Sequence, residues 1–168
     1  MVRADIVRDF TQSELFDRTF REGMELVEQA ATYLDGPGRQ QSKLLSRNAA
    51  LAYASESMRL TTRLMQVASW LLVQRAVREG DMTAQEACEN RYRMGPKPAV
   101  RTPGVTDGYS RVVDDLPEGL LELADRSERL YDRISHLDVR VYVAPEAETL
   151  PNPVLSQFER LRAAFQGQ

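Results

Sequence analysis

The chain has 168 residues, with 22 Lys and Arg against 25 Asp and Glu, a formal net charge of −3 and 42% hydrophobic residues. This balance is typical of one folded domain and excludes a disordered chain. One cysteine excludes an intramolecular disulfide, and one cysteine with one histidine provides too few ligands for a typical zinc site. The composition therefore favours an interaction domain over an enzyme, and we expect no cofactor.

The N-terminus and the most apolar stretch set the expected compartment. Residues 1–10 alternate charged and apolar side chains and lack the apolar region of a signal peptide. Residues 67–77 are the most apolar stretch, but Gln74 and Arg75 interrupt it, far short of the ~20 apolar residues that span a membrane. We expect no membrane span and a cytoplasmic location.

Proline placement divides the chain into windows in which helices can form. Only Pro37 lies in the first 95 residues, and the other seven prolines follow. Ser13 is a good N-cap, and Gly36 and Pro37 stop a helix. These signals predict a first helix over about 13–34, with one apolar face formed by Phe16, Phe20, Met24, Val27, Ala31 and Leu34.

A long second helix is predicted over about 42–79, ending at Gly80. One stripe steps by four and three residues for about four heptads, which is typical of a supercoiled helix: Leu51, Ser55, Met58, Thr62, Met65, Ser69, Leu72 and Ala76. An adjoining stripe contains Tyr53, Leu60, Leu64, Val67 or Ala68, and Leu71. Two stripes indicate that this helix contacts more than one partner helix.

The remaining segments follow from caps and proline. Thr83 with Glu86 forms a capping box that predicts a short helix over 83–92. Residues 93–115, rich in Gly and Pro, are predicted to be a mobile loop. A third helix is predicted over 117–143, and 145–168 form a flexible tail with apolar side chains at helical spacing: Leu155, Phe158, Leu161 and Phe165.

These elements predict an all-α fold, an antiparallel three-helix bundle over residues 1–144 with a long central helix. The central helix exceeds the first in length, so its apolar overhang needs cover. The short helix or a second copy of the chain can supply that cover, and we expect a homodimer. The overhang comprises Trp70, Leu71, Leu72 and Val73.

Few side chains are candidates for chemistry or binding. Asp132 and His136 on one helix face do not complete a metal site, and no metal is expected. Three charged residues of the central helix can contact one another: Glu56, Arg59 and Arg63. We interpret them as surface pairs, or, if buried, as groups that fix the register or bind a partner. The tail residues named above are further partner-binding candidates.

Four segments carry a resemblance to a known family: Phe20–Met24, Tyr33–Gly38, Leu51–Gln66 and Ala68–Leu72. Together they cover most of residues 19–80, and they resemble RcdA, the regulator of CtrA degradation found in alphaproteobacteria. The resemblance implies a dimeric bundle that acts as a non-enzymatic adaptor of the ClpXP protease. In that family CpdR primes ClpX, and RcdA delivers substrates directly or through PopA, which brings in CtrA. The resemblance also implies recruitment to a cell pole with the protease.

Two other functions stay open from the residues. A helical dimeric regulator or scaffold associated with transcription would have no protease role, but the acidic balance favours no nucleic-acid contact. A metal-dependent helical enzyme would require several inward carboxylates together with histidine. The adaptor hypothesis is preferred over both, with the loop or the tail expected to contact partners.

Overall fold

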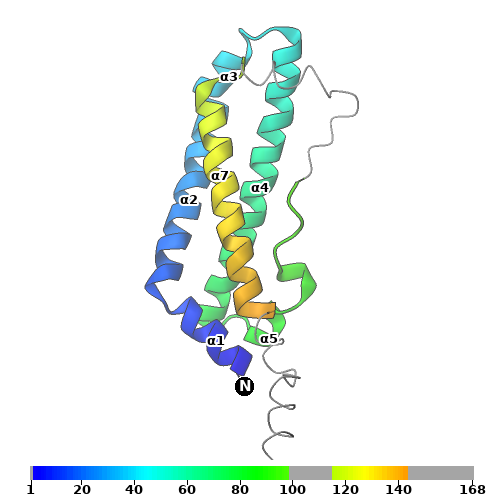
Figure 1. The fold of residues 1–168 in the computed structure, drawn as a ribbon. Helices are drawn as coiled ribbons and strands as arrows, with labels where there is room; N and C mark the ends of the chain where they lie inside the picture. The colour runs from blue at the N-terminus through cyan, green and yellow to red at the C-terminus, as the bar shows by residue number, and fades with distance from the viewer. Residues whose placement is uncertain (1, 99–114, 144–168) are drawn as a thin grey trace, which may run out of the picture.

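The structure is a computed structural model that describes residues 2–98 and 115–143. Within these ranges every regular element is a helix (Figure 1). The all-α fold with a long central helix is therefore confirmed. Most of the predicted loop, 99–114, and the predicted tail, 144–168, lie outside the described residues. None of the described helices combines the length and the apolar character that crossing a membrane requires.

Three long helices form the bundle, and shorter helices lie at its two ends (Figure 1). The long helices are α2, Glu14–Asp35, α4, Arg47–Glu79, and α7, Glu118–Asp138. The α7 helix continues as a π-helix, η2. The shorter elements and η2 have these bounds: α1 Val2–Thr11, α3 Pro37–Ser42, α5 Ala84–Ala87, the 3-10 helix η1 Asn90–Tyr92, and η2 Val139–Val143.

Caps explain where the long helices begin and end. The Ser13 hydroxyl accepts a hydrogen bond from the Phe16 amide at 3.2 Å, as its position predicts. Gly80 ends α4 in the left-handed conformation at φ 85°, which glycine adopts without steric cost. The start of α4 differs from the sequence prediction of about 42, because Ser46 caps it and residues 37–42 form the separate helix α3.

Residue pairs between the helices give their directions. Pairs between α2 and α7 run in opposite order, because Glu22 bonds to Arg133 whereas Gln29 bonds to Arg126. Pairs between α4 and α7 run in the same order along both helices, from Arg63 with Ser127 to Gln74 with Tyr142. The α2 helix is thus antiparallel to the other two, and α4 and α7 are parallel. This order differs from an up-down-up arrangement: after α4 the described residues 93–98 run back along α7, with Arg93 at Asp138 and Lys97 at Glu128 (Figure 1).

The core lies between α2, α4 and α7 and extends to the end of α4, where α1 covers it. Val7 of α1 is fully buried, and the Phe10 ring lies 5.9 Å from the Trp70 ring. Within the overhang of α4, Trp70 is therefore covered by α1, whereas Leu72 stays exposed. The helix α1 was not predicted from the sequence, although Val2, Ile6 and Phe10 follow one another at the four-residue spacing of one helix face.

Candidate interaction surface

The second stripe of α4, not the heptad stripe, faces the core. Leu60, Val67 and Leu71 are fully buried, whereas the large apolar residues of the heptad stripe are exposed to solvent. Their exposed fractions are 65% for Leu51, 71% for Met58, 65% for Met65 and 51% for Leu72. The stripe covers about 32 Å of helix at ~1.5 Å per residue. Regular exposure of large apolar side chains marks an interaction surface rather than scattered surface residues.

The exposed stripe has the same order of residue types in both directions. From Leu51 to Leu72 its heptad positions are Leu, Ser, Met, Thr, Met, Ser and Leu, with Thr62 at the centre. An antiparallel second copy would therefore place Leu51 against Leu72 and Met58 against Met65. A surface that matches itself under a two-fold rotation is the requirement for an isologous dimer. We refer to these seven residues as the α4 stripe.

A groove of about 550 Å³ borders the α4 stripe. On one side it is lined by α4, including Met65 and Ser69, and on the other by η1 and the residues after it, including Tyr92. Residues 93–98 belong to the predicted mobile loop, but they are held on the bundle. The Tyr131 hydroxyl donates to the Gly95 carbonyl, and Lys97 lies 2.6 Å from Glu128. The hydrogen bond to Glu128 raises the pKa of Lys97.

A buried polar cluster holds residues 93–98 at the end of the bundle where α7 continues into η2. Asp138, 5% exposed, accepts from Trp70 Nε1 at 2.9 Å and from Arg93 Nε at 2.7 Å. A second bond joins Arg93 Nη2 to Asp138 Oδ2 at 2.6 Å, so the pair is bidentate. The hydrogen bond to Asp138 raises the pKa of Arg93. These bonds satisfy a carboxylate that would otherwise be costly to bury.

The predicted charged triad separates into a pair and a buried cation. Glu56 and Arg59 form an ion pair, both partly exposed. Arg63 is only 4% exposed and donates to the Ser127 hydroxyl at 2.7 Å and to the Ala124 carbonyl at 3.1 Å. No carboxylate of the described residues pairs with it. Of the alternatives left open by the sequence, this placement favours a role in helix register.

The predicted packing residues of the overhang divide between core and surface. Trp70 and Leu71 are buried within this chain, Val73 packs at the edge of the core, and Leu72 is exposed on the α4 stripe. The sequence showed both stripes but not which one faces inward. The tail candidates lie outside the described residues: Leu155, Phe158, Leu161 and Phe165.

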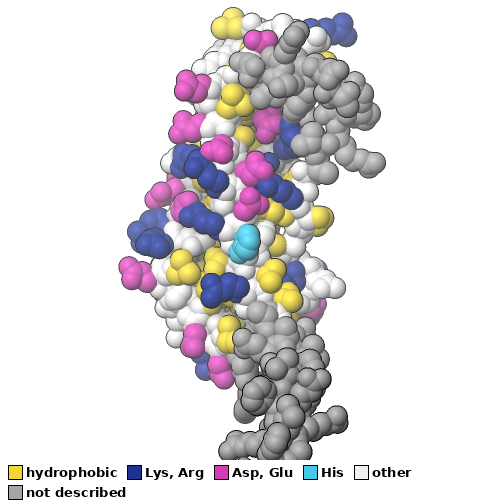
Figure 2. Space-filling model, in the orientation of Figure 1, with side chains coloured by type: hydrophobic (Ala, Val, Ile, Leu, Met, Phe, Trp, Pro, Cys, Tyr) yellow, Lys and Arg dark blue, Asp and Glu magenta, His cyan; other side chains and the backbone are white. Residues whose placement is uncertain are grey.

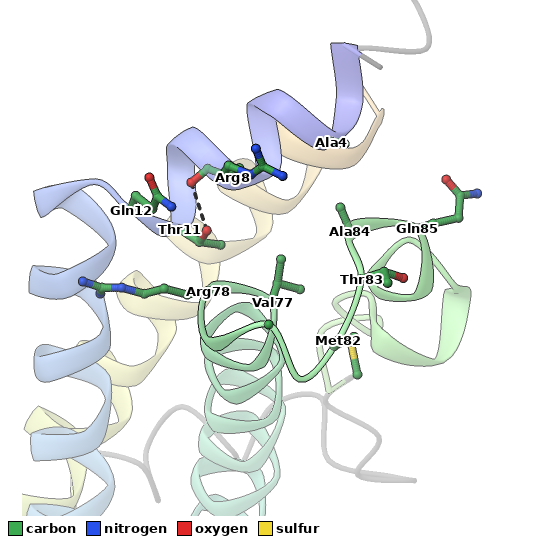
Figure 3. A pocket seen from close by; sticks show the side chains of 11 residues that line it. Ala4, Arg8, Thr11, Gln12, Val77, Arg78, Met82, Thr83, Ala84 and Gln85 are labelled. Atoms are coloured by element: carbon green, nitrogen blue, oxygen red, sulfur yellow. Dashed lines mark hydrogen bonds between the residues drawn. The ribbon is translucent and has the colours of Figure 1, made fainter.

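A further cavity of about 570 Å³ lies between α1, the end of α4 and α5 (Figure 3). Val77 and Ala84 extend into this space, and Arg8 borders it from α1. The Thr11 hydroxyl donates to the Arg8 carbonyl at 3.0 Å. Among the described residues, those that line this cavity include no carboxylate, imidazole or thiol, so they offer no group for general acid–base catalysis near neutral pH. Within the described ranges no group of His, Cys, Asp and Glu could hold a metal ion.

Comparisons with known proteins show which family the chain belongs to. The family model described as "Protein of unknown function (DUF1465)" matches residues 7–165. Among solved structures, RcdA from Caulobacter crescentus CB15 is 60% identical, with a TM-score of 0.64, covering 81% of this chain and 98% of that chain. This chain belongs to the RcdA family. No curated protein matches it. The family resemblance of residues 20–72 is thereby confirmed.

Proposed function

We propose that this protein is a non-catalytic adaptor that helps deliver substrates such as CtrA to the ClpXP protease, together with CpdR and PopA. Membership of the RcdA family supports this role, because the resemblance to RcdA implies it. An adaptor acts by effective concentration, since a tethered substrate meets the unfoldase in a nearly intramolecular encounter. Such a role needs binding surfaces and no reactive side chains. It places the protein in the cytoplasm, recruited to a cell pole with the protease.

The observation that carries the proposal is the exposed α4 stripe. A helix of 33 residues that leaves Leu51, Met58, Met65 and Leu72 in solvent has an unused apolar face. A second copy of the chain is the occupant that its symmetric order fits. We therefore include a homodimer, formed through antiparallel α4 helices, in the proposed function. A dimer would present each remaining surface twice and so raise its avidity for a substrate or protease.

Reconstituted proteolysis tests the adaptor role. ClpXP, CpdR, PopA and fluorescently labelled CtrA are mixed with and without this protein, and loss of CtrA is followed over time. We expect several-fold faster loss when the protein is present, because delivery raises the local substrate concentration. A substrate that ClpXP degrades without an adaptor serves as the control and keeps its rate. Equal rates of CtrA loss with and without the protein would contradict the proposal.

Light scattering on a sizing column tests the dimer. We expect the full chain to have twice the mass of one chain, and Met58→Glu to shift it toward the monomer, since a charge would be buried at the stripe. Leu44→Glu is the matched control, because Leu44 is 87% exposed and lies outside the α4 stripe. A Met58→Glu protein that stays dimeric while Leu44→Glu dissociates would place the interface elsewhere.

A further inference from the structure

A second surface lies between α2 and the end of α7, on the side of the bundle away from the third long helix, α4. Four α2 residues and four residues of α7 and η2 line a groove of about 270 Å³: Leu15, Arg18, Thr19, Glu22, Arg133, His136, Leu137 and Arg140. On each segment they follow the spacing of one helix face. The single histidine, coloured cyan in Figure 2, lies on this face with acidic side chains on one side of it and basic and apolar side chains on the other.

The groove is apolar at its base and open to solvent. Leu15 is 45% exposed, and Leu137 packs at the edge of the core. Two valines of η2, the element that contributes Arg140 to the groove, are also exposed, Val139 by 50% and Val143 by 44%. Apart from the α4 stripe and Leu44, every exposed large hydrophobic residue of the described ranges lies on the two segments that form this groove. A volume of about 270 Å³ suits one large apolar side chain rather than a whole ligand.

The charge of the groove is opposite to that of the chain. Arg133 is neutralised by Glu22 at 2.6 Å. Arg18 and Arg140 have no ion-pair or hydrogen-bond partner among the described residues, although the chain carries a net charge of −3. His136 Nδ1 bonds to the Asp132 carbonyl at 2.7 Å and leaves Nε2 available. Within the part of the chain that the structure describes, the groove therefore offers two guanidinium groups without an ion-pair partner, beside an apolar slot.

The local backbone fixes this arrangement. The last five residues of the helix, Val139–Val143, adopt a π-helix, a rare form that often occurs at functional sites. Its inner side is anchored, because Tyr142 is buried and its hydroxyl donates to Gln74 Oε1 at 2.6 Å. Its outer side carries Val139, Arg140 and Val143. Anchoring on one side holds the exposed residues in place on the other.

We propose that the groove between α2 and η2 binds a short acidic segment of a partner protein, with one large apolar side chain in the slot and carboxylates on Arg18 and Arg140. Charge complementarity selects this occupant. The basic surface is confined to this small groove, and Glu22 lies within it beside Arg133, so an extended polyanion such as a nucleic acid is disfavoured. This inference rests on the proposed adaptor role in one respect: an adaptor needs a surface that binds a segment of another protein.

Fluorescence anisotropy with the full-length protein tests the groove. The probe is a fluorescein-labelled peptide with two glutamates on each side of one leucine. We expect saturable binding, weakened on the order of tenfold or more in Arg18→Gln/Arg140→Gln, because two charge-assisted contacts are lost. Arg39→Gln is the matched control, since Arg39 is exposed on α3 at the other end of the bundle, and we expect it to bind as the unmodified protein does. Circular dichroism confirms that the variants are folded.

Control probes decide between this occupant and others. We expect much weaker binding when lysines replace the glutamates, and when serine replaces the leucine. Equal binding of the lysine peptide, unchanged binding by the double variant, or binding of anionic lipid vesicles but not of the peptide would each overturn the proposal. The assay contains no protease. Absent peptide binding with intact CtrA delivery would therefore overturn this inference alone, and the reverse result would contradict the adaptor role alone.

Discussion

Arg63 is a cation buried in the bundle core, where most positions are apolar. Its guanidinium contacts a hydroxyl and a carbonyl of α7 instead of a carboxylate, and its Nε has no partner among the described residues. Ser127 does not depend on this contact alone, because its hydroxyl also donates to the Ala124 carbonyl at 2.7 Å. We propose that the charge adds specificity of packing at a desolvation cost.

Replacing Arg63 separates its charge from its volume. We expect Arg63→Met to change the free energy of unfolding by less than about 1 kcal/mol or to raise it, since methionine keeps the packing and removes the buried charge. Arg63→Ala leaves a cavity, and we expect it to lower the free energy of unfolding by about 2–4 kcal/mol. Urea unfolding followed by circular dichroism measures both. Equal losses for the two variants would show that the guanidinium contacts themselves stabilise the fold.

Tyr142 links stability to alkaline pH. Burial raises its pKa from 10 to about 12, so the folded state favours the neutral phenol. Its contribution is complete below pH 10 and is lost as the pH rises from 10 through about 12. We expect urea unfolding to show a loss of about 1 kcal/mol from this group between pH 9 and pH 11.

Tyr142→Phe is the control for that pH dependence and should make the loss smaller. It should not remove the loss entirely, because burial also raises the pKa of Tyr33 and Tyr53. An unchanged slope in the Tyr142→Phe protein would show that other groups carry the alkaline instability.

At the scale of helices, the contact between α2 and α4 depends on a residue without a side chain. A Cβ at Gly23 would lie 2.5 Å from Leu71 Cδ1 and 3.7 Å from Val67 Cγ1. Glycine in a helix interior ordinarily costs about 1 kcal/mol relative to alanine. Here it permits close approach of the two helices.

Gly23→Ala therefore tests whether helix approach outweighs helix propensity. We expect the substitution to lower the free energy of unfolding by about 1 kcal/mol, because overpacking of about 1–3 kcal/mol exceeds the propensity gain. In a Leu71→Ala background the same change should become neutral or stabilising. Thermal unfolding of the four proteins of this cycle measures the coupling, and additive effects would show that Leu71 is not the obstacle.

The sequence predicts the elements well where local signals exist. Ser13, Gly36 and Gly80 mark helix ends through caps that act within a few residues. The break at 43–46 carries no glycine or proline, so it was hidden in the predicted helix from 42 to 79. Helix direction was also beyond local signals, because the path of residues 80–117 decides whether α7 runs parallel or antiparallel to α4.

At the scale of the whole molecule, the sequence alone could not predict which residues form the candidate surface. Both stripes of α4 have helical spacing, and only the positions of α2 and α7 determine which one is buried. Arg63 is buried next to the second stripe despite its charge, whereas Met58 and Met65 of the heptad stripe are exposed. The groove between α2 and η2 joins residues more than a hundred positions apart, so no motif could reveal it.

The proposed dimer makes a prediction about register. If the helices are antiparallel about Thr62, residue 58 of one chain faces residue 65 of the other. Met58→Lys and Met65→Glu should each weaken the dimer, and the double variant Met58→Lys/Met65→Glu should recover much of it, because lysine meets glutamate twice. Met58→Glu/Met65→Glu is the control and should stay monomeric. Sedimentation velocity distinguishes them, and a double variant as weak as the singles would exclude this register.

The parallel order of α4 and α7 also determines how the chain can fold. The α2–α3–α4 hairpin can close progressively from the turn at α3, where Gly38 meets Tyr53. Contacts of α4 with α7 instead join residues 61 to 68 positions apart, so a long loop must close before any of them forms. We expect the hairpin to be structured in the folding transition state and α7 to dock later. Substitutions at Leu60 should then slow refolding, whereas substitutions at Ile134 should mainly speed unfolding.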